Sequence, residues 1–425
     1  MAIYRDGQKY PPAAPVAAQA FAVTILVAAS DSLHSAADLV CTGVNDHLVI
    51  QAALDALPAT GGEVMLLDGT YNIGVSLALD SYQALTGQGR GTVLTSTVAD
   101  LDVITAIGSD SDEKVGILIA DLCVDTTPGG VGDDVGILWN YVDYSRIEGV
   151  WLHGNGEKGI YLNYCDFNEI GDNISQSNGH AGIELENSND NIVTGNTCQA
   201  NHRNGIYLDG SSNNIISENI CQGQIVPNYS GIYISESNSN IISGNTCQGN
   251  RDTGINLYAS DNNTITGNNC QGHIFYEGIF LWESHNNTIT GNNCQGNDDC
   301  GINLLSADNN TITGNICRGN SYEGIYLDSS INNTIVGNTC LENSQDTTNV
   351  SDDIALVGDS DYNNVQCNTC RAGVLPNKPR YGINIVDAAC DGNLVTNNDI
   401  HDDGFGTAAF NDDGTATITV GGNRI

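Results

Sequence analysis

The chain has 425 residues, 49 of them glycine, and its 51 acidic against 13 basic side chains give a formal net charge of −38. A surface this acidic repels polyanions, so we expect no nucleic-acid partner. No stretch is apolar for long enough to span a bilayer, and we expect no membrane insertion. We interpret most of the carboxylates as a solubilising or salt-adapted coat.

The first residues combine prolines with a long uncharged stretch. Residues 13–30 are uncharged and follow Arg5 and Lys9, as in a signal peptide. The β-branched run 23–27 instead predicts a strand, so no clear signal peptide is present. We expect residues 1–20 to be a flexible or particle-attachment segment.

A Gly-Ile-x-Leu motif then recurs every 23 to 26 residues. Its regular copies begin at Gly159, Gly182, Gly205, Gly231, Gly254, Gly278, Gly301 and Gly324, and looser copies at Gly116, Gly136, Asp353 and Gly382. Short alternating strands separated by Asn, Gly and Ser are typical of stacked rungs. The period predicts a single-stranded parallel β-helix of about 11 or more rungs over residues 111–400, with residues 21–110 forming an N-terminal cap and first coils.

An Asn-x-Cys motif closes the same rungs. Its cysteines are Cys198, Cys221, Cys247, Cys270, Cys294, Cys317, Cys340 and Cys370. Equivalent residues of stacked rungs form ladders, and in-register Cβ vectors suit disulfides poorly. We therefore predict free core thiols, and asparagines that cap turns and one another. Residues 401–425, including a strand over 415–420, should close the far end.

Residues 46–73 resemble the first segment of pectate-lyase-like right-handed β-helix proteins, which include phage tailspikes and secreted polysaccharide lyases and epimerases. Gln51-Ala52-Ala53-Leu54 matches the family's short capping helix, and Gly69-Thr70-Tyr71 its following strand. The later rungs resemble carbohydrate-binding and sugar-hydrolase β-helices and the copper-chaperone-like periplasmic protein of nitrous oxide reduction. The catalytic signatures of alginate epimerases and polygalacturonases are absent, and no Met-rich or His-rich tract supports copper.

Aligning the rungs on their glycine identifies one outward face rich in aromatic and titratable side chains. Its columns lie two positions before, two after and four after the glycine. Pyranose rings stack on aromatic faces, and sugar hydroxyls need acceptors, so we expect a polysaccharide-binding groove. The expected binding residues are Glu157, Tyr161, Tyr229, Tyr233, Asp252, Tyr276, Phe280 and Trp282.

The richest patch of this face supplies the candidate catalytic residues His180, Glu184, Glu186, Arg203, Tyr207 and Asp209. Glu186 and Asp209 should stack on adjacent rungs, so one pKa should rise and provide a general acid. So close a pair suits a retaining hydrolase, whereas Glu184 with Asp209 would suit inversion. In a lyase, Arg203, His180 or Tyr207 would be the base, with Ca²⁺ as the one cofactor considered.

The leading interpretation is a carbohydrate-active β-helix that depolymerises a polysaccharide as a lyase or glycoside hydrolase. The alternative is a non-catalytic glycan-binding or structural phage-tail or surface protein, and a metal-delivery protein of the copper-associated type is least favoured. The face could also be an exposed ladder without chemistry. We expect an extracellular or virion-associated location, and a homotrimer if the protein is a tailspike. His153, His202, His273 and His285 are assigned to turns.

Overall fold

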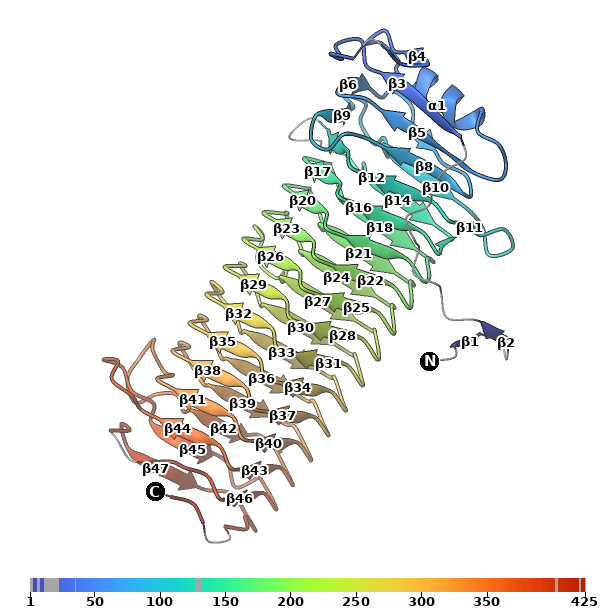
Figure 1. The fold of residues 1–425 in the computed structure, drawn as a ribbon. Helices are drawn as coiled ribbons and strands as arrows, with labels where there is room; N and C mark the ends of the chain where they lie inside the picture. Colours follow the sequence, from blue (N-terminus) through green and yellow to red (C-terminus); the bar gives the residue numbers. More distant parts are fainter. Residues whose placement is uncertain are drawn as a thin grey trace.

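The computed structural model describes residues 3–5, 8–10, 23–34, 36–126, 132–401, 404–419 and 422–424. The fold is an all-β right-handed parallel solenoid of about 15 turns, which confirms the predicted class (Figure 1). Strands β1 (Ile3–Arg5) and β2 (Gln8–Tyr10) form an antiparallel pair. The rest of the predicted segment 1–20 lies outside the described residues, as do residues 402 and 403.

Three long parallel sheets run along the solenoid axis in the described part of the chain (Figure 1). The fourteen-stranded sheet contains β7 (Leu77–Ala78), β10 (Ile104–Ile107), β14 (Ile137–Asn140), β18 (Ile160–Asn163), β21 (Ile183–Glu186), β24 (Ile206–Asp209), β27 (Ile232–Ser235), β30 (Ile255–Tyr258), β33 (Ile279–Trp282), β36 (Ile302–Leu305), β39 (Ile325–Asp328), β42 (Ile354–Val357), β45 (Tyr381–Ile385) and β47 (Ala408–Asp412). The sixteen-stranded sheet contains β4 (Leu39–Val40), β3 (Thr24–Ala28), β5 (Gly62–Leu66), β8 (Gln83–Thr86), β12 (Leu118–Ala120), β16 (Arg146–Glu148), β19 (Glu169–Gly171), β22 (Ile192–Thr194), β25 (Ile215–Ser217), β28 (Ile241–Ser243), β31 (Thr264–Thr266), β34 (Thr288–Thr290), β37 (Thr311–Thr313), β40 (Thr334–Val336), β43 (Asn364–Gln366) and β46 (Leu394–Thr396). The thirteen-stranded sheet contains β6 (Gly69–Asn72), β9 (Thr92–Thr95), β13 (Cys123–Asp125), β17 (Trp151–His153), β20 (Ile174–Gln176), β23 (Thr197–Gln199), β26 (Ile220–Gln222), β29 (Thr246–Gln248), β32 (Asn269–Gln271), β35 (Asn293–Gln295), β38 (Ile316–Arg318), β41 (Thr339–Leu341) and β44 (Thr369–Arg371). A short pair, β11 (Lys114–Val115) and β15 (Val142–Asp143), adds a local fourth side.

The helix α1 (His47–Asp55) lies at the N-terminal end of the solenoid (Figure 1). Its buried Ile50, Ala53 and Leu54 belong to the same hydrophobic core as the rungs. The predicted short helix is thus confirmed, and it covers apolar side chains that the first coil would otherwise expose to water. Within the described ranges, no helix is long and apolar enough to cross a membrane.

The glycine that opens each regular rung is required by close packing. A Cβ atom on Gly278 would lie 2.7 Å from the Gly301 carbonyl oxygen and 2.9 Å from the Cys294 Cβ. Every other residue would therefore push the next rung away. The following Ile and Leu of each motif are fully buried, so the core is one continuous column along the axis.

The cysteine ladder lies inside this column. Successive members, such as Cys221 and Cys247, are register partners on adjacent strands. All eight ladder thiols are fully buried, and the cysteines are unpaired. The structure confirms the prediction of free core thiols.

The asparagine ladder satisfies the backbone at each rung's corner. The Asn196 Oδ1 accepts the backbone N–H of Asn173 on the preceding rung at 3.0 Å. Its Nδ2–H donates to the Asn219 Oδ1 at 3.0 Å and to the Ile170 carbonyl at 2.8 Å. The same contacts recur along the ladder as far as Asn398 and Asn423. Side-chain amides therefore replace the sheet hydrogen bonds that a corner interrupts.

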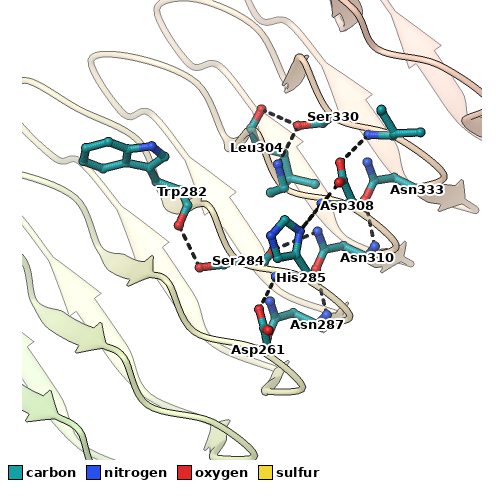
Figure 2. A network of polar contacts seen from close by, with 12 residues as sticks. Asp261, Trp282, Ser284, His285, Asn287, Leu304, Asp308, Asn310, Ser330 and Asn333 are labelled. Atoms are coloured by element: carbon teal, nitrogen blue, oxygen red, sulfur yellow. Dashed lines mark hydrogen bonds and ion pairs between the residues drawn. The ribbon is translucent and has the colours of Figure 1, made fainter.

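Two histidines substitute for ladder residues. His285 extends a turn ladder: its backbone N–H donates to Asp261 Oδ1 at 2.7 Å, and its Nδ1 accepts the Asp308 N–H at 3.0 Å (Figure 2). The sequence assigns His273 to a turn, but its side chain is buried in a second corner ladder, between Asn250 and Asn297. His273 thus lies outside the strands, as assigned, but at a repeat position that points inward. The turn assignment is wrong for His153, which is the last residue of β17.

The C-terminal end departs from the prediction of a strand over 415–420. The described residues there form isolated bridges, Asp391 with Thr415 and Leu394 with Ile418. Ala416 has φ +50°, which interrupts the extended conformation that a strand requires.

Candidate functional site

The fourteen-stranded sheet positions the predicted face. Tyr161, Glu184, Tyr207 and Tyr233 are register partners on β18, β21, β24 and β27. Four residues after the glycine, Glu186 opposes Asp209 on adjacent strands, as the alignment predicts. The strand pairing therefore reproduces both of these columns.

The sequence alignment overlooked the residue directly before the glycine. Strict alternation would turn this side chain inward, yet the Lys158 Nζ lies 3.2 Å from the Glu184 carboxylate and 3.7 Å from the centre of the Tyr161 ring. The chain bends as it enters the strand, so this column shares the outer face. A lysine or glutamate at an apparently buried position was the signal that could have identified it.

Lys158 and Glu184 form the centre of an ion-pair cluster. Glu184 is only 5% exposed, and Lys158 also lies 3.2 Å from Glu157. His180 Nδ1 is 3.3 Å from the second oxygen of Glu184. Three predicted residues, Glu157, His180 and Glu184, are therefore brought together, but around a cation that the prediction lacked.

The second pair of predicted carboxylates lies beside this cluster. Tyr161 donates its hydroxyl hydrogen to Glu186, and burial, with this carboxylate next in effect, raises the pKa of Tyr161. Burial raises the pKa of Asp209, and the charges of Glu186, Glu236 and Glu184 raise it further. The expected rise in pKa falls on Asp209, while Glu186 is held by the tyrosine.

The aromatic residues continue the face toward the C-terminal end. Tyr207 and Tyr233 stack with ring centres 5.3 Å apart and planes 12° from parallel. Trp282, 43% exposed, contacts Tyr258 at 4.9 Å between centres.

The remaining predicted aromatic positions lie around these two ring pairs. Arg203 does not reach the carboxylates in any contact described: its guanidinium lies 5.2 Å from the Tyr229 ring centre. Phe280 pairs in register with Asn256, and Tyr276 is exposed.

Further buried acids lie on the rungs that open at Gly254, Gly278 and Gly324. Glu277 accepts from the Asn303 amide at 2.8 Å, and burial, with Asp299 adding repulsion, raises its pKa to about 7. Burial likewise raises the pKa of Glu323 to about 7 and that of the predicted residue Asp252 to about 6. The sequence prediction missed both glutamates, because each directly precedes a glycine.

No metal site is evident among the described residues: no group of three or more His, Cys, Asp or Glu side chains is close enough to hold an ion. The carboxylates and rings of the face can supply proton transfer, hydrogen bonding and ring stacking.

Comparison with solved structures gives right-handed β-helix proteins at low identity. The A-module of a mannuronan C-5 epimerase from Azotobacter vinelandii is 17% identical over 89% of this chain and 96% of its own, with a TM-score of 0.46. A variant of the periplasmic alginate epimerase AlgG is 18% identical over 69% and 78%, with a TM-score of 0.51. Tailspike protein 3 of bacteriophage CBA120 is 14% identical over 89% of this chain and 59% of its own, with a TM-score of 0.58.

Comparison with curated protein sequences gives no match. A family model described as periplasmic copper-binding protein (NosD) matches residues 129–273, 250–353 and 276–423. These overlapping matches follow the repeated rungs and cover most of the solenoid, so the chain belongs to the NosD family.

Proposed function

We propose that the protein binds a polysaccharide along the outer face of the fourteen-stranded sheet between β18 and β33. The observation that carries this proposal is one continuous face on which the carboxylates of Glu186 and Asp209 lie on adjacent rungs and the ring pairs Tyr207–Tyr233 and Tyr258–Trp282 follow. Rings offer platforms for pyranose faces, and carboxylates accept hydrogen bonds from hydroxyls. The β-helix fold shared with epimerases and a tailspike is compatible with this use.

We further propose that Asp209 and Glu186 hydrolyse the bound glycan. Asp209, whose pKa is raised, would give its proton to the leaving oxygen, while Glu186 would attack the sugar from the position fixed by Tyr161 and form a glycosyl ester. A water molecule, deprotonated by Asp209, would then displace Glu186 from the sugar and restore both carboxyl groups. Carboxylates on adjacent strands lie about 4.8 Å apart, near the ~5–5.5 Å typical of retaining enzymes. Burial raises the pKa of Tyr207, which disfavours it as the base of a lyase.

Glu184 has a different proposed role. The Lys158 ammonium balances its charge, and burial leaves it nearly inaccessible. We propose that it positions Lys158, which covers one face of the Tyr161 ring, rather than acting as the partner of Asp209 in an inverting mechanism.

Non-catalytic glycan binding is the second candidate function. The specific observation in its favour is that Lys158 already pairs with both Glu157 and Glu184, as in a static surface network. With this function we propose an extracellular or virion-associated location and a homotrimer of the tailspike type.

Copper delivery is implied by the family's description but does not fit the residues described. Cu(I) prefers Cys and Met ligands. The chain has 2 Met, the eight ladder thiols are fully buried, and no suitable cluster occurs in the described ranges. The side chains in these ranges therefore do not form a set of ligands that suits a copper ion.

The test is a panel of neutral and uronate polysaccharides, incubated with and without Ca²⁺. Release of reducing ends without unsaturated uronate absorbance is expected, and both Asp209→Asn and Glu186→Gln should abolish it. Asp328→Asn is the matched control, because Asp328 occupies the same column five rungs away and should leave the rate unchanged. Unsaturated ends would establish elimination instead, and binding without any product would establish the second candidate.

A further inference from the structure

A cavity of about 320 Å³ lies beside the proposed glycan face, where the chain turns out of the fourteen-stranded sheet. The loop between β10 and β11 projects from the solenoid here (Figure 1) and forms one wall. The volume is at the small end of the ~300–1,000 Å³ typical of ligand sites. The principal lining residues are Asp110, Glu113, Tyr141, Tyr164, Asn187 and Asn189.

The floor of the cavity consists of two tyrosines at one repeat position. The rings of Tyr141 and Tyr164 stack with centres 5.0 Å apart and planes 6° from parallel. Tyr164 is 47% exposed, so the outer face of the stack is open to a ligand.

The backbone at this position gives tyrosine no advantage. Both tyrosines have φ +54°, and the next rungs place Asn187 and Gly210 there with φ +48° and +57°. Asparagine and glycine adopt this left-handed conformation at the least cost. The two tyrosines therefore occupy a turn that smaller residues form more easily, so the turn conformation itself does not require their rings.

The wall is fixed to this floor by backbone hydrogen bonds. The Gly108 N–H donates to the Asn140 carbonyl at 2.8 Å, and the Lys114 N–H donates to the Tyr141 carbonyl at 2.9 Å. The Lys114 ammonium points elsewhere, since it pairs with Asp80 at 2.8 Å. The cavity is thus preformed, and this lysine is not among its lining residues.

Acidic and amide groups surround the rings. Asp143, Asp166 and Gly210 complete the lining, and each aspartate accepts a backbone N–H of the next rung at 2.7 Å, which keeps it in place. With Asp110 and Glu113 these two aspartates make four carboxylates, and the lining contains no lysine or arginine. Such a surface accepts hydrogen bonds from hydroxyls and repels an anionic ligand.

We propose that this cavity binds an uncharged sugar ring stacked on Tyr164 and forms an end subsite of the glycan face. Tyr164 directly follows Asn163, whose register partner is Glu186, so a glycan lying on the face can continue into the cavity. This inference rests on the proposed function, which supplies the polysaccharide ligand. The cavity adds the class of sugar, which is a neutral residue and not a uronate.

The experiment measures calorimetric binding of neutral oligosaccharides and of oligogalacturonides to the full chain. Tyr164→Asn removes the ring but keeps a residue that the next rung uses in the same conformation. Tyr362→Asn is the matched control, because Tyr362 also has positive φ and is 59% exposed on a distant rung. We expect Tyr164→Asn to weaken binding of a neutral oligosaccharide about tenfold or more, and Tyr362→Asn to leave it unchanged.

Unchanged affinity in Tyr164→Asn would overturn the subsite, and so would tighter binding of oligogalacturonides than of every neutral probe. Trp282→Ala separates this failure from that of the proposed function, because Trp282 lies on the face but outside the cavity. Binding that is lost in Trp282→Ala and kept in Tyr164→Asn would remove the subsite alone. Binding that is lost in Tyr164→Asn and kept in Trp282→Ala would support the subsite and contradict the proposed glycan face. Wild-type protein that binds no probe would contradict both proposals.

Discussion

Replacing His273 by asparagine is expected to raise stability and to weaken its dependence on pH. His273 Nδ1 accepts the Asn250 N–H, so the neutral ring carries its proton on Nε2, which is buried without a hydrogen-bond partner. In the neighbouring rungs an asparagine at this position donates to a backbone carbonyl, as Asn250 does to Cys221 at 3.1 Å. His273→Asn can restore this bond, which contributes about 1 kcal/mol.

The pH dependence follows from burial. Burial lowers the pKa of His273 from 6.5 to about 3, so between these values the unfolded chain binds a proton that the folded chain does not. Stability is therefore lost as pH falls below about 6.5, and the loss is complete near pH 3. Between pH 7.5 and pH 5.0 the histidine should account for a loss of about 2 kcal/mol, at ~1.4 kcal/mol per pH unit.

Urea unfolding followed by circular dichroism at pH 7.5 and pH 5.0 measures this difference. Groups common to both proteins cancel when the pH effect in His273→Asn is subtracted from that in the wild type. His401→Asn, at an exposed histidine, should show the wild-type pH effect. A difference below about 0.5 kcal/mol between wild type and His273→Asn would show that the folded ring is protonated or reaches water.

Three further outcomes are expected. In the native protein the exposed Cys367 should react promptly with a thiol reagent, and the buried cysteines should react only after unfolding. Rapid reaction of several thiols in the native protein would contradict the closed core. Asn245→Ala should lower the free energy of unfolding by roughly 2–4 kcal/mol in urea titrations, because it leaves two buried backbone groups of the preceding rung, the Asn219 N–H and the Ile216 carbonyl, without their partner. The exposed Gln248→Ala should change it little. Lys158→Met should lower the free energy of unfolding by roughly 3–5 kcal/mol, because it leaves Glu184 buried without its cation. Adding Glu184→Gln should recover much of this loss, and a double variant whose loss equals the sum of the two single losses would refute the ion pair.

The fold was predictable because the sequence repeats with the period of one rung. A glycine without room for a side chain, a buried cysteine and a corner asparagine recur in most of the regular rungs, and periodicity makes all three visible without coordinates. The two columns of side chains that contain Tyr161 and Glu186 could be predicted from strand alternation alone.

The site was less predictable because alternation fails where the backbone bends. Lys158 stands before a glycine, where the chain is not yet a strand, so its direction cannot be counted from the sequence. Tyr164 occupies a turn, and nothing local shows that a loop from another rung meets it. His273 has turn neighbours, and its burial depends on the ladder on either side. Each depends on contacts between residues far apart in sequence.

The corner asparagines also give the solenoid a dipole along its axis. From Asn173 to Asn423, each amide donates Nδ2–H to the Oδ1 of the next rung, so every dipole points the same way. Aligned hydrogen bonds polarise one another, much as peptide units do along a helix. The row carries its positive pole toward the C-terminal end of the solenoid, and each added rung lengthens this macrodipole without reversing it.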